Sequence, residues 1–285
     1  MTLPSPTRAL IYLAVLCCGG ALLHSAPPPP DPWAQASQFL FNDAHQSFTQ
    51  TTSAPDRTDR LGAAVVLLNV QPRTAGNLTA ARTALEGLVA ENASDEAGLN
   101  ARFFLGRIAS LHQTPSDLAT ARRYFDALIA QNPAHPLAQQ AVVKLALLDF
   151  YPANGKPPAS ALYTRYATHA DALTDASARR DLHLLLARAC LFYQASQPAS
   201  VASFSPAEYA LTHYQAALAT GALSFRVRGE TLVAIGELAH ALGRDAVAAE
   251  AWRAFLSAYS RDIRAGTITA HLAALSDPAA PAATP

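Results

Sequence analysis

Residue types that serve in catalysis are scattered along this chain rather than grouped. The nine histidines are His24, His45, His112, His135, His169, His183, His213, His240 and His271. No two of them have the His-x-x-x-His spacing that places two zinc ligands on one helix face, and none belongs to a glutamate-adjacent zinc signature. We therefore expect the histidines to lie on helix surfaces.

Signatures of other reactions are missing as well. The chain has no Cys-x-x-Cys pair, no glycine-rich loop of the phosphate-binding type and no Gly-x-Ser-x-Gly nucleophile turn. The glutamates are equally dispersed and have no evident catalytic partner: Glu86, Glu91, Glu208, Glu230 and Glu237. The sequence therefore predicts a protein that is not an enzyme and that holds no cofactor and no metal.

Composition favours an all-helical chain. Of the 285 residues, 51% are hydrophobic, with alanine prominent among them, and only 15% are charged, against roughly 25% in typical globular domains. Alanine is the strongest helix former. The formal net charge is zero, so no basic field would attract nucleic acid or an anionic membrane surface.

The N-terminal residues 1–26 have the features of a signal peptide or an N-terminal anchor. Arg8 precedes an uncharged apolar run of 15 residues, Ala9 to Leu23. That run is shorter than the about 20 residues of a membrane span, and it has the length of a signal-peptide core. Cleavage is expected after Ala21. We therefore expect export to the periplasm or another part of the bacterial cell envelope.

The cysteines bear on membrane attachment and on redox chemistry. Cys17 and Cys18 lie where a bacterial lipoprotein carries its acylated cysteine, although Leu16, rather than a small residue, precedes Cys17. Lipidation therefore stays open beside cleavage and beside an uncleaved anchor. Cys190 would be the last cysteine after cleavage and lies in an apolar helical run, so we expect a buried small hydrophobe.

The elements that position these residues are clearest between Gly229 and Ser260, where two short amphipathic helices join through a tight turn. The first helix has an apolar stripe at helical period: Leu232, Ile235, Leu238 and Ala239. Gly243 ends it as a left-handed C-terminal residue would. The second helix carries Ala248, Trp252 and Phe255 on one face. We expect Gly236 to face Ala248, which would let the two helices approach closely.

This helix pair resembles the tetratricopeptide repeat. The resemblance rests on the spacing of Leu232, Ile235, Gly236, Ala239, Gly243, Ala248, Trp252 and Phe255. Ala239 stands where the family has tyrosine, and Ser260 stands where it has proline. Comparable small-residue anchors recur about forty residues apart, at Ala81, Ala121, Leu162, Ala210 and Ala248. The resemblance implies an all-α, right-handed superhelical solenoid of stacked antiparallel helix hairpins.

The domain organisation follows from composition breaks. Residues 27–56 are expected to form a proline spacer and an N-terminal cap helix from Trp33 to Thr49. Residues 57–276 would form the repeat domain, with a weak break at 152–158, and residues 277–285 a disordered tail. Two details are also expected within the domain: Ser116 as a helix N-cap, and Phe192 in the apolar set of a helix from Ala178 to Tyr193, with Leu182, Leu185, Leu186 and Ala189.

A second likeness concerns the kind of function. The spacing of Phe125, Leu128, Pro133, Pro136 and Ala141 resembles the repeats of bacterial envelope proteins such as the outer-membrane-assembly lipoprotein BamD and the Tol-Pal coordinator protein. It implies a non-catalytic scaffold that binds a protein or peptide partner. Two alternatives remain open, a helical accessory domain of a peptidoglycan-acting envelope enzyme and a purely structural spacer.

The tetratricopeptide resemblance also implies where a partner would bind. In that family ligands lie against the first helix of each pair, on the concave face. Carried onto this chain, the candidate residues of one unit are Asn100, Phe103, Arg107 and Ser110. Those of the C-terminal unit are Glu230, Val233, Glu237 and His240.

Overall fold

The computed structural model describes residues 31–50, 55–152, 160–194 and 205–276. In these ranges the chain forms 13 α-helices, one short π-helical turn, η1 (Ile108–His112), and no strand. The α-helices are α2 (Pro32–Ser37), α3 (Phe41–Gln50), α4 (Arg57–Leu67), α5 (Ala75–Glu91), α6 (Glu96–Arg107), α7 (Leu118–Gln131), α8 (Pro136–Phe150), α9 (Ser160–Ala172), α10 (Ala176–Gln194), α11 (Pro206–Ala219), α12 (Phe225–Ala241), α13 (Asp245–Ala258) and α14 (Ala265–Ser276). The predicted all-α fold is confirmed.

Several predicted segments lie outside the described residues. These are the signal peptide or anchor (1–26), the proline run that follows it, the C-terminal tail (277–285) and most of the break at 152–158. None of the helices that the structure describes is both long enough and apolar enough to span a bilayer. Export and membrane attachment therefore stay predictions.

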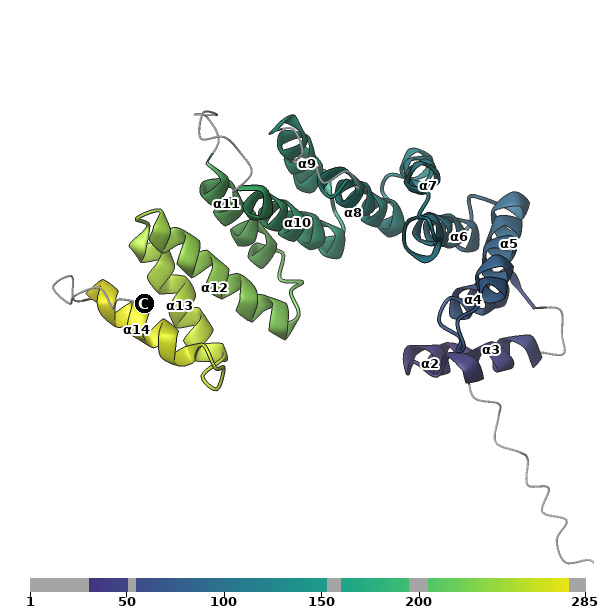
Figure 1. Ribbon diagram of the computed structural model, residues 1–285, viewed down its shortest axis with the longest axis horizontal. Coiled ribbons are helices and arrows are strands. Elements are labelled where there is room, and N and C mark those ends of the chain that lie inside the picture. Colours follow the sequence, from purple (N-terminus) through teal and green to yellow (C-terminus); the bar gives the residue numbers. More distant parts are fainter. Residues whose placement is uncertain (1–30, 51–54, 153–159, 195–204, 277–285) are drawn as a thin grey trace, which may run out of the picture.

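The helices follow one another along an open arch (Figure 1). Each α-helix makes substantial contact only with α-helices one or two places away in the described chain. Helices α4, α6, α8, α10 and α12 line the inner side of the arch and are called the inner helices here. The hydrophobic core is divided into clusters between neighbouring helices. Stacked hairpins pack in this neighbour-to-neighbour way, while the right-handed superhelical twist stays a prediction.

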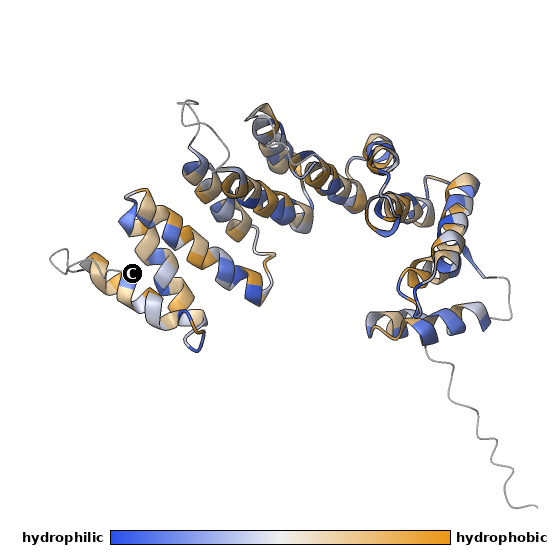
Figure 2. Ribbon diagram, viewed as in Figure 1, coloured by the Kyte–Doolittle hydropathy of each residue, from blue (hydrophilic) through white to orange (hydrophobic). Residues whose placement is uncertain are grey.

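Every helix of the arch carries both hydrophobic and hydrophilic residues (Figure 2), as expected where one face is buried on a neighbour. In the C-terminal hairpin the buried residues include the predicted Leu232, Ile235, Ala239, Ala248, Trp252 and Phe255. Gly243 has a φ of +69°. Its N–H donates to the His240 carbonyl at 2.9 Å, and the Arg244 N–H donates to the Ala239 carbonyl at 2.8 Å. A left-handed glycine therefore closes α12, as predicted.

A glycine in α12 admits an aromatic ring from α13. A Cβ on Gly236 would lie 2.1 Å from Nε1 of Trp252, and its three nearest atoms would all belong to that indole. The sequence predicted that Ala248 would face Gly236, but the residue that packs against Gly236 is Trp252. A hairpin further along the arch repeats the arrangement, because a Cβ on Gly106 of α6 would lie 2.6 Å from Cε1 of Phe125 in α7. In both hairpins a missing side chain on the inner helix makes room for a ring on the outer one.

The Gly236→Ala variant is expected to lower the free energy of unfolding by about 1–3 kcal/mol. The added methyl group must displace the indole of Trp252, and overpacking of this kind outweighs the gain of roughly 1 kcal/mol in helix propensity. Urea denaturation followed by circular dichroism measures the difference. The control is Gly87→Ala in α5, where a Cβ would meet no atom within 4 Å, so it should be neutral or stabilising. Equal effects of the two substitutions would contradict this packing.

The hairpin of α8 and α9 is more open than the others. The rings of Phe150 and Tyr163 lie with centroids 4.7 Å apart, and those of Phe150 and Tyr166 lie 5.6 Å apart. These rings hold the two helix axes apart, and α8 packs more closely against α10 than against α9. The predicted anchor Leu162 is only half-buried, whereas Tyr163 and Tyr166 are buried. In the other hairpins a buried alanine occupies the anchor position. In α9 that position is therefore taken by a half-buried leucine.

Three local predictions were wrong. The helix expected from Trp33 to Thr49 is two helices, α2 and α3, because Phe39 adopts a φ of +63° and turns the chain. The N-cap of α7 is Asp117, whose carboxylate accepts from the Thr120 N–H at 2.9 Å, rather than Ser116. Phe192 of α10 is exposed, unlike the other members of its apolar set, which are buried.

Candidate functional site

The candidate residues of α6 divide between surface and core. Asn100 and Arg107 are half-buried. The Arg107 guanidinium lies over the ring of Phe104, 5.4 Å from its centroid. Phe103 is only 7% exposed, and its ring packs 5.9 Å from that of Phe125. Asn100 and Arg107 can therefore contact a partner, whereas Phe103 belongs to the contact between helices.

The candidate residues of α12 divide in the same way. Glu230 is half-buried, and Glu237 and His240 are exposed. His240 is engaged with Asp245, with 2.8 Å between Nδ1 and the carboxylate. Val233 is only 8% exposed. Val233, like Phe103, faces a neighbouring helix, because an inner helix is flanked by packed helices and keeps a narrow solvent-facing stripe.

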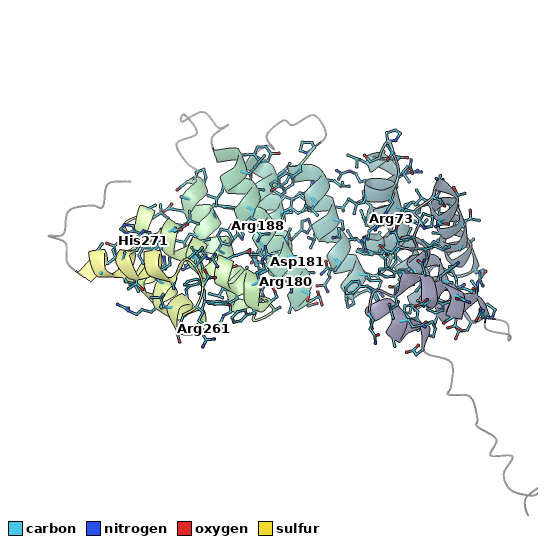
Figure 3. All side chains as sticks on the ribbon, turned by 60° about the horizontal axis from the view of Figure 1, so that its bottom comes forward. Arg73, Arg180, Asp181, Arg188, Arg261 and His271 are labelled. Atoms are coloured by element: carbon cyan, nitrogen blue, oxygen red, sulfur yellow. The ribbon has the colours of Figure 1, made fainter. Side chains whose placement is uncertain are left out.

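Helices α8 and α10 lie between these two sets and form a groove of about 440 Å³. Its walls are Val143, Lys144 and Leu147 of α8, Tyr151 directly after α8, and Asp181, Leu184, Leu185 and Arg188 of α10. The spacings of three, four and seven residues place each set on one face of its helix. Figure 3 shows Asp181 and Arg188 near the middle of the molecule. We call this region the α8–α10 groove.

The groove contains a cation without a matching carboxylate. Lys144 is half-buried, and burial lowers the pKa of its ammonium group, as does the positive charge of Arg107, while Asp181 acts in the opposite direction. The Asp181 carboxylate is engaged by Arg180 at 2.7 Å. Among the described residues, no carboxylate lies within ion-pair distance of Lys144 or Arg107.

The other end of the groove is aromatic and partly open to solvent. Leu147 is 37% exposed, Tyr151 40% and Phe192 67%. The ring centroids of Tyr151 and Phe192 are 5.9 Å apart, and those of Tyr151 and Tyr193 are 6.1 Å apart. Exposed aromatic rings with charged groups beside them are characteristic of surfaces that bind other proteins.

The residues of this groove were missed from sequence. The candidate positions were taken from the two helices with a glycine at the repeat position, and α8 and α10 have none. A signal was present, however. Lys144 stands alone in the apolar run from Val142 to Leu148, and Asp181 and Arg188 flank the apolar centre of α10. Isolated charges in otherwise apolar helices mark the stripe that faces solvent.

Two histidines depart from the predicted surface position. His183 of α10 and His213 of α11 are 2% and 6% exposed, and their Nδ1 atoms lie 2.9 Å apart. When both rings are neutral, the Nδ1–H of one ring donates to the unprotonated Nδ1 of the other. Burial lowers the pKa of His213 to about 4, and it lowers the pKa of His183 as well. The pair joins two helices inside the core.

Cys190 is another reactive side chain within the described ranges. Cys190 is buried as predicted, its thiol lies 3.5 Å from the Pro206 carbonyl, and burial raises its pKa to about 12. A thiol with so high a pKa is a poor nucleophile at neutral pH. No group of three or more potential metal ligands is found in the part of the chain that the structure describes.

Comparison with known proteins finds no protein-family model and no curated protein that match this chain. The class of the protein is therefore drawn from its geometry alone. It is an all-helical chain of neighbour-packed helices with a charged, partly aromatic groove on its inner side. Its likeness to tetratricopeptide repeats remains a resemblance of spacing.

Proposed function

We propose that this chain is a non-catalytic adaptor of the bacterial cell envelope that binds a protein or peptide partner on the concave face of a tetratricopeptide-like solenoid. The observation that carries the proposal is the α8–α10 groove, where Leu147 and Tyr151 are exposed beside charged side chains and the exposed ring of Phe192 packs against Tyr151. A few residues carry most of the binding energy at protein interfaces, and tyrosine and arginine are enriched among them.

The arch supports the proposal because it offers an extended surface. A stack in which each helix packs only on its neighbours presents a long inner face, along which a partner segment can contact several helices. The half-buried Arg107 of α6 and the exposed Glu237 of α12 stand on either side of the groove, so a partner lying across it would meet both. The envelope location is proposed from the apolar run of residues 9–23.

The adaptor proposal is tested by site-specific photo-crosslinking in envelope fractions of the source cells. A photo-reactive amino acid replaces Leu147 in the groove, and the control places it at Thr164, an exposed position on the outer helix α9. We expect a discrete cross-linked protein from Leu147 and none from Thr164. Adding Tyr151→Ala should lower the yield about tenfold or more, because it removes an aromatic contact.

The result would contradict the proposal if Leu147 gave no adduct or gave the same adducts as Thr164. The identity of the cross-linked protein separates the proposed adaptor from its rival. A peptidoglycan-acting enzyme as the adduct would make the chain the accessory domain of that enzyme. Any other envelope protein would identify the client of an adaptor.

A further inference from the structure

We infer that the α8–α10 groove selects a partner segment in which a carboxylate stands close to an aromatic or large aliphatic side chain. The inference rests on the proposed function and names the chemistry of the partner. It is drawn from the distribution of charge, burial and exposed apolar surface within the groove.

The carboxylates near the groove already have partners. Asp181 is engaged by Arg180 at 2.7 Å, and Glu230 by Arg226 at 3.0 Å. Arg188 stands 3.9 Å from Glu230, at the outer limit of an ion pair. The acidic groups are therefore neutralised by arginines from their own helices.

The cations on the neighbouring helices lack such partners. Lys144 on α8 is half-buried, and Arg107 on α6 adds its own positive charge to the environment of that ammonium group. No carboxylate of the described chain approaches either side chain within ion-pair distance. A partly desolvated charge without a counter-ion is less favourable than a fully hydrated one. A carboxylate from a partner would supply the missing charge and form a charge-assisted hydrogen bond.

The apolar part of the selected segment follows from the residues beside Lys144. Leu147 and Tyr151 lie three and seven residues further along α8, which corresponds to about 4.5 and 10 Å at a rise of 1.5 Å per residue. An extended peptide covers these distances with one to three residues. The partner's carboxylate and apolar side chain should therefore be one to three positions apart.

A polyanion such as nucleic acid fits the groove less well. The whole chain has no net positive charge, and Arg180 and Arg226 beside the groove are already engaged by Asp181 and Glu230. One carboxylate matches the single ammonium group of Lys144, whereas a phosphate backbone carries a charge at every residue. The occupant that matches the groove is a peptide segment with a localised negative charge.

The test uses the rarity of lysine in this chain. Lys144 and Lys156 are its only lysines, so reductive ¹³C-methylation gives one resolved NMR signal for each. The probe is the peptide acetyl-Gly-Asp-Ala-Phe-Ala-Gly-amide. We expect it to shift the Lys144 signal and raise the pKa of Lys144 while leaving Lys156 unchanged. Peptides with asparagine for aspartate, or alanine for phenylalanine, should bind at least about tenfold more weakly.

The matched variants are Lys144→Gln and Lys156→Gln, which remove the same charge at two places. Fluorescence anisotropy of the labelled probe should show about tenfold weaker binding to Lys144→Gln and unchanged binding to Lys156→Gln. The inference is overturned if the acidic and amide peptides shift Lys144 equally, if Lys144→Gln binds as the wild type does, or if the probe does not bind. If cross-linking from Leu147 still succeeds, the adaptor proposal stands and only the partner's chemistry is wrong.

Discussion

Replacing Trp252 by alanine is expected to lower the free energy of unfolding by about 3–5 kcal/mol. Trp252 lies on α13 and is fully buried. Its indole packs against Gly236 of α12, and its ring centroid lies 5.2 Å from that of His271 in α14. Alanine would leave a cavity that the backbone of three helices cannot close. Urea denaturation of the purified protein, followed by circular dichroism at 222 nm, measures the loss.

The Trp252→Phe variant keeps an aromatic ring at this position and reduces only its volume. Among the described residues Nε1 of Trp252 has no hydrogen-bond partner, so phenylalanine should cost only about 1–2 kcal/mol, through the smaller ring. Combining it with Gly236→Ala places a methyl group in the vacated space. That double variant should be more stable than the sum of the single effects implies. A Trp252→Ala protein as stable as the wild type would refute the assigned packing.

Acidification from pH 6.5 to 4 is expected to cost about 3 kcal/mol of stability through His213 alone. Burial lowers its folded-state pKa from 6.5 to about 4, so the unfolded chain binds the proton more readily. The stabilisation is complete above the unfolded pKa and is lost as the pH falls toward the folded pKa. His183 shifts in the same direction and adds to the effect.

Charged neighbours modify this pH dependence. Arg179 on α10 lowers the pKa of His183, whereas Asp171 on α9 raises the pKa of both histidines; for each histidine burial is the largest influence. Replacing both histidines, as His183→Leu with His213→Phe, should flatten the stability profile between pH 7 and 4. His240→Gln, which changes an exposed histidine, is the control and should keep the wild-type slope. An unchanged slope in the double variant would assign the acid sensitivity to other groups.

The open hairpin of α8 and α9 connects the packing with the proposed site. Phe150, Tyr163 and Tyr166 fill the space between those two helices and keep their axes apart. Helix α8 packs instead on α10, the next inner helix. Lys144 and Asp181 are thereby brought to the two walls of one groove. The irregularity in the stack lies where the candidate binding groove forms.

Sequence alone determined the class of fold and much of its core. Alanine-rich amphipathic periods predicted the helices, and the recurring small or aromatic positions Ala81, Ala121, Phe125, Ala210 and Trp252 are all buried. These features are local, because helical period and propensity are set within a few residues of the chain. The glycine that closes α12 was predictable for the same reason.

Only the tertiary structure decided which side chains share a site. Phe103 and Val233 had the spacing of partner-facing residues, yet both pack on neighbouring helices. His183 and His213 are 30 residues apart and meet in the core, and Lys144 and Asp181 line one groove from two inner helices. Such pairings depend on the sizes of the side chains that separate the helix axes, and helical period carries no information about those distances.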